Sequence, residues 1–266
     1  MSRQAAAVWD PAQYGAFGGE RARPFAELTA RLGAAGTDPA RITDLGCGTG
    51  ELTATLAGRW PHAAVDALDS SPEMIARARE HEIPGRLRFR VADITTWRPE
   101  RPVDLIVSNA ALQWIAEHTD LLPRWAGALA PGGCLAFQVP GNFDAPSHVL
   151  LRELGRSDRW RRKLGALQHD APVLDPAGYL DLLTRHGYAV DAWETTYTQV
   201  LHGDDPVLEW VKGTTLRPVL TALDPGETAE FLTAYGEALR QAYPAAPYGT
   251  VYPFRRIFVI ARRTTP

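Results

Sequence analysis

The sequence predicts an α/β protein built on a doubly wound, mostly parallel sheet. In the first half, short apolar runs alternate with amphipathic helical segments, and such alternation joins parallel strands through crossover helices. The first apolar run ends in a loop with glycine at positions 46, 48 and 50. The chain has 266 residues, of which 45% are hydrophobic. This length is enough for one large domain, or for a domain with a cap.

The expected strands of the first half are short and are separated by helix starts and stops. They span residues 41–45, 64–68, 87–91, 103–108 and 134–139. A helix is expected over 51–60, and a second one begins at Pro72, because proline favours the first helical turn. The clearest helical pattern covers 120–129. The turn Pro131-Gly132-Gly133 is expected to introduce the fifth strand.

The alternation changes after residue 140. Residues 146–187 and 205–243 have helical patterns, whereas 188–200 and 254–261 are rich in strand-forming residues. We therefore expect a single domain over 1–266. Within it we expect a cofactor-binding core at 36–140, helical cap insertions at 141–187 and 201–250, and the last sheet strands at 188–200 and 254–262.

Composition limits the partners of the protein. The net charge of −3 provides no basic field for phosphates, so no nucleic-acid partner is expected. Cys47 and Cys134 form no disulfide framework, which indicates a reducing compartment. The N-terminus lacks a signal-peptide core, and no apolar run has the length of a membrane span. We expect a cytoplasmic monomer or weak homo-oligomer without membrane contact or a metal site.

The glycine loop at 46–50 follows the first strand, where ligands of open parallel sheets bind. It lacks the Gly-Lys-Ser/Thr ending of a phosphate-binding loop and the G-x-G-x-x-G spacing of a dinucleotide site. Asp44 and Glu51 flank the loop and would repel a pyrophosphate. A ligand with a positive centre and a zwitterionic amino acid suits this loop better.

Polar side chains also follow the next three strands. Asp69 ends the second strand, where an acid can accept hydrogen bonds from ribose hydroxyls. Asp93 and Ile94 follow the third strand, as an acid for an adenine amino group and an apolar neighbour for the ring. Asn109 ends the fourth strand. Because the carboxyl ends of parallel strands share one edge, we expect these residues in one crevice.

These motifs resemble the class I S-adenosylmethionine-dependent methyltransferases. D-L-G-C-G-T-G at 44–50, Asp69, A-D-I at 92–94 and S-N-A-A-L-Q-W at 108–114 occur in that family's order. The resemblance implies a Rossmann-like sheet with an antiparallel last strand, and S-adenosyl-L-methionine as the cofactor, released as S-adenosyl-L-homocysteine. The expected cofactor-binding residues are Asp44, Gly46, Cys47, Gly48, Gly50, Asp69, Ser70, Met74, Asp93, Ile94 and Asn109, with Arg23 at an expected helix start.

A closer resemblance extends beyond the cofactor core, to the trans-aconitate methyltransferase family. It is carried by W-D-P-A-Q-Y at 9–14, P-G-N-F at 140–143, W-E-T-T-Y at 193–197 and F-R-R-I-F-V-I-A at 254–261, among other segments. That family esterifies one carboxylate of a tricarboxylic acid. The resemblance therefore implies a carboxyl O-methyltransferase with a small-molecule tricarboxylate substrate.

The chemistry of a carboxylate acceptor indicates which residues to expect. A carboxylate is ionised at neutral pH, so the enzyme has to position it rather than deprotonate it. Arginine suits the other carboxylates because its planar fork matches them. The candidates are Gln113 and Trp114 for substrate positioning, and Arg217, Arg255, Arg256 and Tyr14 for substrate binding. Adjacent residues of a strand face opposite sides, so only one of Arg255 and Arg256 is expected to face the pocket.

Other interpretations stay open at this point. Trp114 is alternatively a core aromatic residue, and Arg217 a solvated surface residue. The acceptor is alternatively another small carboxylic acid or a natural product. Two alternatives come from other classes of protein. One is an NAD(P)-dependent oxidoreductase, which the glycine spacing disfavours, and the other is a nucleoside-binding protein without catalysis.

Overall fold

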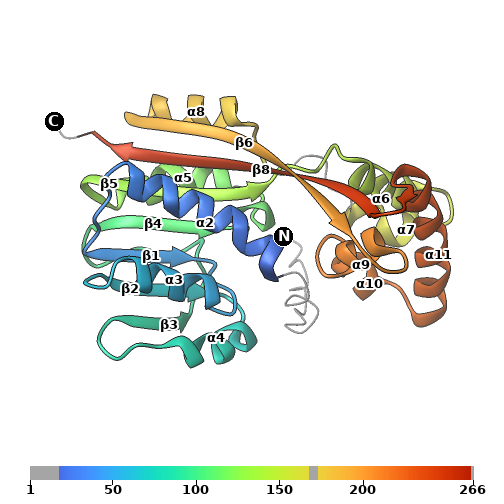
Figure 1. Ribbon diagram of the computed structural model, residues 1–266, viewed down its shortest axis with the longest axis horizontal. Helices are drawn as coiled ribbons and strands as arrows, with labels where there is room; N and C mark the ends of the chain where they lie inside the picture. The colour runs from blue at the N-terminus through green and yellow to red at the C-terminus, as the bar shows by residue number, and fades with distance from the viewer. Residues whose placement is uncertain (1–17, 168–172, 265–266) are drawn as a thin grey trace. The chain divides into compact units, whose positions relative to one another are not determined.

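The computed structural model describes residues 18–167 and 173–264. The chain divides into two compact units. Of the described residues, the sheet unit comprises 19–140, 173–195 and 256–264, and the helical unit comprises 18, 141–167 and 196–255. Figure 1 labels the α-helices and most strands of both units.

The strands follow the doubly wound order that the sequence predicts. They are β1 (Arg41–Leu45), β2 (Ala64–Asp69), β3 (Leu87–Val91), β4 (Val103–Asn109), β5 (Leu129–Pro140), β6 (Tyr188–Leu201), β7 (Ala245–Ala246) and β8 (Gly249–Arg263). Within the described residues the sheet order is β3-β2-β1-β4-β5-β8-β6, with β7 beside β8. Strands β1 to β5 pair in parallel, whereas β8 pairs antiparallel with β5. The order reverses between β1 and β4, which makes their carboxyl ends the expected ligand position.

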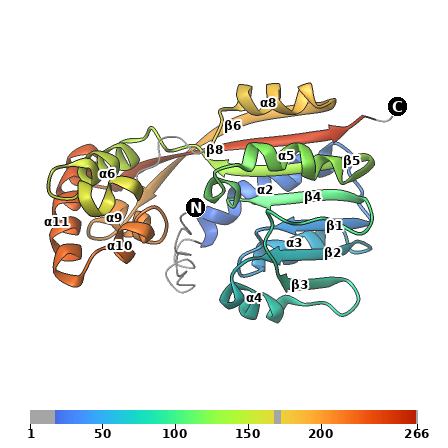
Figure 2. The same cartoon turned by 180° about the vertical axis from the view of Figure 1, so that it is seen from behind.

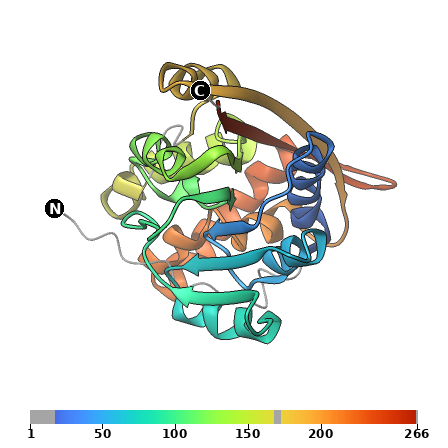
Figure 3. The same cartoon turned by 90° about the vertical axis from the view of Figure 1, so that its left-hand side faces the viewer.

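Helices cover both faces of the sheet. Helices α2 (Gly18–Ala34) and α3 (Glu51–Arg59) lie on one face, and α5 (His118–Gly127) and α8 (Pro176–Arg185) lie on the other (Figures 1 and 2). Figure 3 shows the sheet edge-on between these helices. The remaining short helices of this unit are α4 (Pro72–Ala78), η1 (Arg79–His81) and η2 (Leu112–Trp114). One apolar core, with Trp125 and Phe137 fully buried, joins strands to α5 and α8.

Local signals were misleading in two places. Pro24 lies inside α2 rather than at a helix start, because burial of Phe25 and Leu28 against the sheet outweighs the hydrogen bond that proline removes. The expected turn at 131–133 is an irregularity within β5 instead. In the pairing of β4 with β5, Val103 lies opposite Leu129, and Leu105 lies opposite Cys134. The extra residues between Leu129 and Cys134 therefore form a bulge in β5.

The helical unit contains most of the helices of the second half of the chain, whereas α8, within the expected helical stretch 146–187, belongs to the sheet unit. The helices of the helical unit are α6 (Pro146–Arg156), α7 (Arg161–Leu164), η3 (Gly165–Leu167), α9 (Pro206–Lys212), α10 (Arg217–Ala222) and α11 (Pro225–Ala242). Helix α11 begins with a capping box between Asp224 and Glu227. Its buried Phe231 and Tyr235 join Trp160 and Tyr252 in a separate apolar core.

Candidate active site

The loop after β1 presents its backbone at the carboxyl edge of the sheet. The N–H groups of Gly46 and Cys47 both donate to the carbonyl oxygen of Leu68, at 2.8 and 3.0 Å. Gly46 has a φ of 88°, and a Cβ there would lie 2.4 Å from the Cβ of Ala111. Only glycine therefore fits between the loop and the segment after β4. A Cβ at Gly48 would meet nothing within 4 Å, so the backbone is open to a ligand there.

Asp69, the last residue of β2, is hydrogen-bonded to this loop. Its Oδ2 accepts the N–H of Gly48 at 2.9 Å, and its Oδ1 accepts the N–H of Ser71 at 2.9 Å. Ser71 in turn caps α4, because its side chain accepts the N–H of Met74. The side chain of Met74 is buried, whereas Ser70 is exposed. Each carboxylate oxygen has a second lone pair. Asp69 can therefore still accept hydrogen bonds from ribose hydroxyls.

The residues after β3 also reach the loop. Ile94 is 8% exposed, and its Cδ1 lies 3.9 Å from the position of a Cβ built on Gly46. Asp93 is exposed, and its Oδ1 accepts the N–H of Thr95 at 2.8 Å. The structure thus brings an apolar side chain and a nearby carboxylate to the edge where the adenine was expected. Their contacts with adenine stay predictions.

Amide side chains follow β4 at the same edge. Ala110 has a φ of 53°, which is uncommon for a residue with a Cβ, and its N–H donates to the carbonyl of Gln138 at 2.9 Å. Gln113 donates from Nε2 to the carbonyl of Ala110 at 2.5 Å. Oε1 of Gln113 and Oδ1 of Asn109 are buried and accept no hydrogen bond from the described residues. Trp114 is 45% exposed, so the alternative of a core aromatic residue is wrong.

Asp44 is a buried acid two residues before Gly46 of the loop, with 3% of its surface exposed. Burial raises the pKa of Asp44 to about 7, although the Thr53 hydroxyl donates to its Oδ2 at 2.6 Å and opposes this effect. The negative charge of Asp69 adds to the increase in this pKa. A cation bound near Asp44 would favour the charged carboxylate.

Cys47 and Gly50 have structural roles in the loop. Burial raises the pKa of the Cys47 thiol, and the carboxylates of Asp44 and Asp69 raise it further. The thiol therefore stays protonated and is unsuited to nucleophilic attack. At Gly50, where φ is 85°, a Cβ would lie 2.9 Å from the ring of Phe89, so glycine allows α3 to begin close to β3.

Gln138 is not among the residues that the sequence singles out, yet it lies at this edge. It is 1% exposed, and its Oε1 accepts a hydrogen bond from Nη1 of Arg256 at 3.3 Å. Arg256 is 7% exposed. The register places Asn109 of β4 and Phe258 of β8 beside Gln138. The available signal was a lone amide within the apolar run 134–139.

Two of the predicted arginines belong to the helical unit. Arg255 is half-buried; its N–H donates to Oδ1 of Asn142 at 2.5 Å, and its Nη1 donates to the carbonyl of Gly141 at 3.3 Å. Arg217 is the first residue of α10 and is also half-buried. Neither is a fully solvated surface residue. Their binding roles stay predictions.

The residues expected near the N-terminus are less well defined. Arg23 lies on α2 with 67% of its side chain exposed, and it donates to Glu27 at 3.0 Å. Its role as a cofactor ligand stays a prediction. Tyr14 lies outside the described residues.

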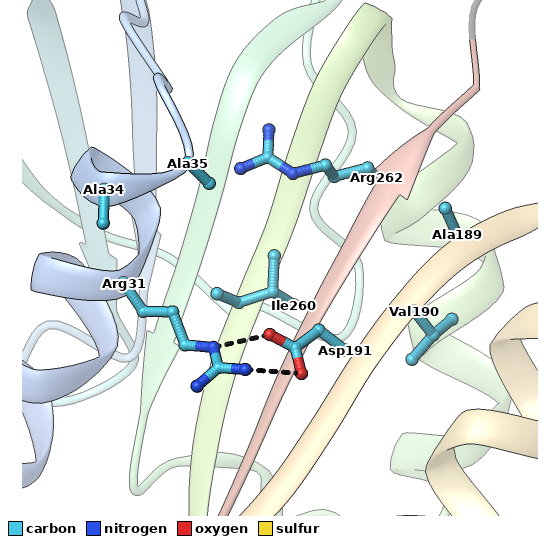
Figure 4. A pocket seen from close by; sticks show the side chains of 8 residues that line it. All are labelled: Arg31, Ala34, Ala35, Ala189, Val190, Asp191, Ile260 and Arg262. Atoms are coloured by element: carbon cyan, nitrogen blue, oxygen red, sulfur yellow. Dashed lines mark hydrogen bonds and ion pairs between the residues drawn. The ribbon is translucent and has the colours of Figure 1, made fainter.

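A cavity of about 520 Å³ lies at the opposite edge of the sheet (Figure 4). It is lined by Arg31, Ala34, Ala35, Ala189, Val190, Asp191, Ile260 and Arg262. Arg31 forms a bidentate ion pair with Asp191 across it. Arg262 pairs in register with Cys134, where the regular pairing of β5 with β4 resumes after the irregularity. None of the predicted site residues lines this cavity.

Metal and membrane features can be assessed for residues 18–167 and 173–264. Within them, no group of three or more His, Cys, Asp or Glu side chains is placed to hold a metal ion. No helix in these ranges has the length and apolar character needed to cross a membrane.

Known proteins resemble this chain over nearly its full length. Residues 42–133 match the methyltransferase domain family. A trans-aconitate 2-methyltransferase of Streptomyces avermitilis is 56% identical over 260 residues, which cover 96% of this chain and 97% of the relative. The trans-aconitate 2-methyltransferases of Rhodococcus jostii and Mycobacterium tuberculosis are 50% and 45% identical. Each alignment covers 96% of this chain, and they cover 99% and 96% of those relatives.

Solved structures share the fold at low identity. The YcgJ protein of Bacillus subtilis has a TM-score of 0.58 and 15% identity, covering 91% of this chain and 99% of that one. The plantazolicin methyltransferase BpumL, solved with S-adenosylhomocysteine, has a TM-score of 0.52 and 16% identity. The alignment covers 95% of this chain and 89% of BpumL. At these identities the likeness concerns the fold alone.

The methyltransferase domain match and the named relatives show that the chain is an S-adenosylmethionine-dependent methyltransferase, and the reversed strand order agrees with this class. The relatives narrow this class, because their identity extends well beyond residues 42–133. The chain belongs to the trans-aconitate 2-methyltransferase family. The oxidoreductase alternative is therefore wrong.

Proposed function

We propose that the protein transfers a methyl group from S-adenosylmethionine to a carboxylate oxygen of trans-aconitate. The products are a monomethyl ester and S-adenosylhomocysteine. The observation that carries this proposal is identity of 45–56% over 96% of the chain with relatives named trans-aconitate 2-methyltransferase. That span includes the segments outside the methyltransferase domain, where residues for the acceptor are expected.

The described residues fit the cofactor. The bare backbone at Gly48, the carboxylate of Asp69 and the apolar side chain of Ile94 suit a methionyl group, a ribose and an adenine, in that order. Asp44 and Asp69 supply negative charge beside the loop, which favours a positively charged ligand. When bound, S-adenosylmethionine supplies an electrophilic methyl group on a positively charged sulfur.

The protein's own contribution is to bind and orient the acceptor. A carboxylic acid with an ordinary pKa of about 4 is already ionised at neutral pH, so no residue has to remove a proton. The acceptor oxygen forms its bond to the methyl carbon as the carbon–sulfur bond breaks, and that electron pair stays on sulfur. Gln113 and Trp114, which follow β4, are proposed to hold this oxygen in line. Arg217, Arg255 and Arg256 are proposed to bind the carboxylates that are not methylated.

We also propose that the enzyme works in the cytoplasm, as a monomer or weak homo-oligomer, on a small molecule and without nucleic acid. A net charge of −3 and a pI near 6.2 support the absence of a nucleic-acid partner, because neither favours binding to polyphosphate. Light scattering after size exclusion measures the oligomeric state directly.

Turnover on a panel of carboxylic acids tests the acceptor. We expect mass spectrometry to detect a monomethyl ester, with the highest kcat/KM for trans-aconitate. A higher kcat/KM for another acid would identify a different acceptor for the same chemistry. Binding of S-adenosylhomocysteine without ester formation from any acid would contradict carboxyl methylation.

A further inference from the structure

We propose that Gln138 and Arg256 form a carboxylate-binding pair that selects acceptors by a carboxylate other than the one methylated. The inference rests on the proposed function. It adds a residue that neither the motifs nor the comparisons assign, and it places one acceptor subsite wholly within the sheet unit.

The pair is buried and its hydrogen bonding is asymmetric. Gln138 is 1% exposed and Arg256 is 7% exposed. Oε1 of Gln138 accepts Nη1 of Arg256 at 3.3 Å, which orients the guanidinium group. Nε2 of Gln138 is buried and donates to none of the described residues. A buried amide donor without an acceptor is unfavourable, and in native proteins such groups usually have a partner. The bound acceptor is a partner that would satisfy it.

The position of the pair is next to the expected methyl donor. Gln138 is the register partner of Asn109, the last residue of β4. The carbonyl of Gln138 accepts the N–H of Ala110, and the next residue, Ala111, lies against Gly46 of the glycine loop. A chain of direct contacts therefore connects Gln138 to the loop that is proposed to bind the cofactor.

The donor set indicates the ligand's chemistry. The free Nε2 of Gln138 is a neutral donor, and the guanidinium of Arg256 is a charged donor. Two such donors on adjacent strands match the two oxygens of a carboxylate, and the arginine supplies the compensating charge. Oε1 of Gln138 is engaged by Arg256 and keeps its amide in this orientation. An acceptor without this extra carboxylate would leave the buried Nε2 of Gln138 without an acceptor among the described residues.

Three variants separate binding from packing. Gln138→Leu removes the donor, whereas Gln138→Glu preserves the shape but places a carboxylate beside Arg256 that competes with the acceptor. Arg262→Leu is the matched control, because Arg262 is six residues along the same strand, on the same face, at the opposite edge. Each variant is assayed for kcat/KM with trans-aconitate and with three dicarboxylic acids that each lack one of its carboxylates. Calorimetry measures S-adenosylhomocysteine affinity, and thermal unfolding measures stability.

We expect Gln138→Leu to lower kcat/KM for trans-aconitate about tenfold to hundredfold, mainly through KM. For the dicarboxylate that lacks the bound group, kcat/KM should change less than threefold. Gln138→Glu should be at least as impaired as Gln138→Leu while unfolding at the same temperature as the wild type or higher. Arg262→Leu should keep the wild-type selectivity, and all Gln138 variants should keep wild-type affinity for S-adenosylhomocysteine.

Two results would overturn the inference. A packing role predicts the reverse order, with the isosteric Gln138→Glu nearly fully active and Gln138→Leu impaired and less stable. Equal losses for the tricarboxylate and all dicarboxylates would likewise exclude selection by this pair. Failure of the proposed function has a different signature, because the wild type itself would then form no ester from trans-aconitate.

Discussion

The carboxylate of Asp69 accepts the backbone N–H of Gly48 at 2.9 Å, which joins the end of β2 to the glycine loop after β1. Asp69 also accepts the N–H of Ser71 at the start of α4. One side chain thus orders two neighbouring turns and, in the proposed function, binds the ribose. Loop geometry and cofactor affinity are therefore expected to change together when Asp69 is replaced.

Replacing Asp69 by alanine should weaken binding of S-adenosylhomocysteine. The expected loss is about 1.5–3 kcal/mol, the range for hydrogen bonds to a charged group, or roughly ten- to more than a hundredfold in Kd. Calorimetric titration measures this change. Asp38→Ala is a suitable control, because Asp38 is exposed and pairs with His62 at the surface. Unchanged affinity in Asp69→Ala would show that the end of β2 does not bind the cofactor.

Replacing Asp44 by asparagine should stabilise the ligand-free protein at neutral and higher pH. The pKa of Asp44 is raised by burial to about 7 from an ordinary 3.8. Its contribution to stability is therefore fully present below pH 3.8 and is lost as pH rises through 7. Ionisation of Asp44 therefore lowers the free energy of unfolding by about 4 kcal/mol at pH values well above 7, compared with pH values below 3.8. Urea unfolding at several pH values should show Asp44→Asn gaining most near pH 8, and little near pH 4. A constant difference would contradict the raised pKa.

We expect His148 to lower the free energy of unfolding of the helical unit as the pH decreases. It is 7% exposed, with Ser147 Oγ 3.2 Å from Nδ1 and Thr215 Oγ1 3.2 Å from Nε2. Burial lowers its pKa from 6.5 to about 4, and the positive charge of Arg152 contributes to this. Stability from the neutral ring is present above pH 6.5 and is lost as pH falls through 4, by about 3 kcal/mol.

The measurement is urea unfolding followed by tryptophan fluorescence between pH 4 and 8. His148→Asn should be less stable than the wild type at pH 8 but should lose less stability on acidification. His62→Asn is the control, because His62 is exposed on the surface. The same slope in the wild type and in His148→Asn would show that His148 titrates normally.

Replacing an arginine that binds a spectator carboxylate should affect the acceptor and not the cofactor. Arg217→Ala, Arg255→Ala and Arg256→Ala are assayed with trans-aconitate, and each lost contact should cost about 1.5–3 kcal/mol in kcat/KM. Affinity for S-adenosylhomocysteine should barely change. Arg159→Ala is the control, since Arg159 pairs with Glu230 at the surface. Full kcat/KM in all three variants would remove the physical basis for a tricarboxylate acceptor.

The methyl-transfer rate of the cofactor-saturated enzyme should be nearly independent of pH from mildly acidic pH upward. An ionised carboxylate needs no general base, so no proton leaves in the rate-determining step. Single-turnover measurements between about pH 6 and 9 test this. A steep increase with an apparent pKa near that of histidine would indicate a base that the mechanism lacks.

Much of the candidate cofactor site follows from local patterns. The strand ends at Leu45, Asp69 and Asn109 agree with the sequence or differ by one residue, because apolar runs bounded by glycine, proline and polar residues are short-range signals. Parallel pairing then brings those ends to one edge whatever the details of packing. Signals failed where tertiary packing competes with local preference, as at Pro24 inside α2.

What the sequence determined by itself is the α/β class, the glycine loop, the acid that ends β2 and the acid that follows β3, since each depends on neighbours within about 30 residues. Only the tertiary structure decided that Arg256 is buried against Gln138, a residue 118 positions away, and that Asn109 lies beside Gln138. Because side chains alternate along a strand, Arg255 and Arg256 lie on opposite faces of β8. This alternation does not tell which of the two arginines lies on the face of Gln138. That depends on how β8 aligns with β5, and the register of two distant strands is set by the packing of the whole sheet.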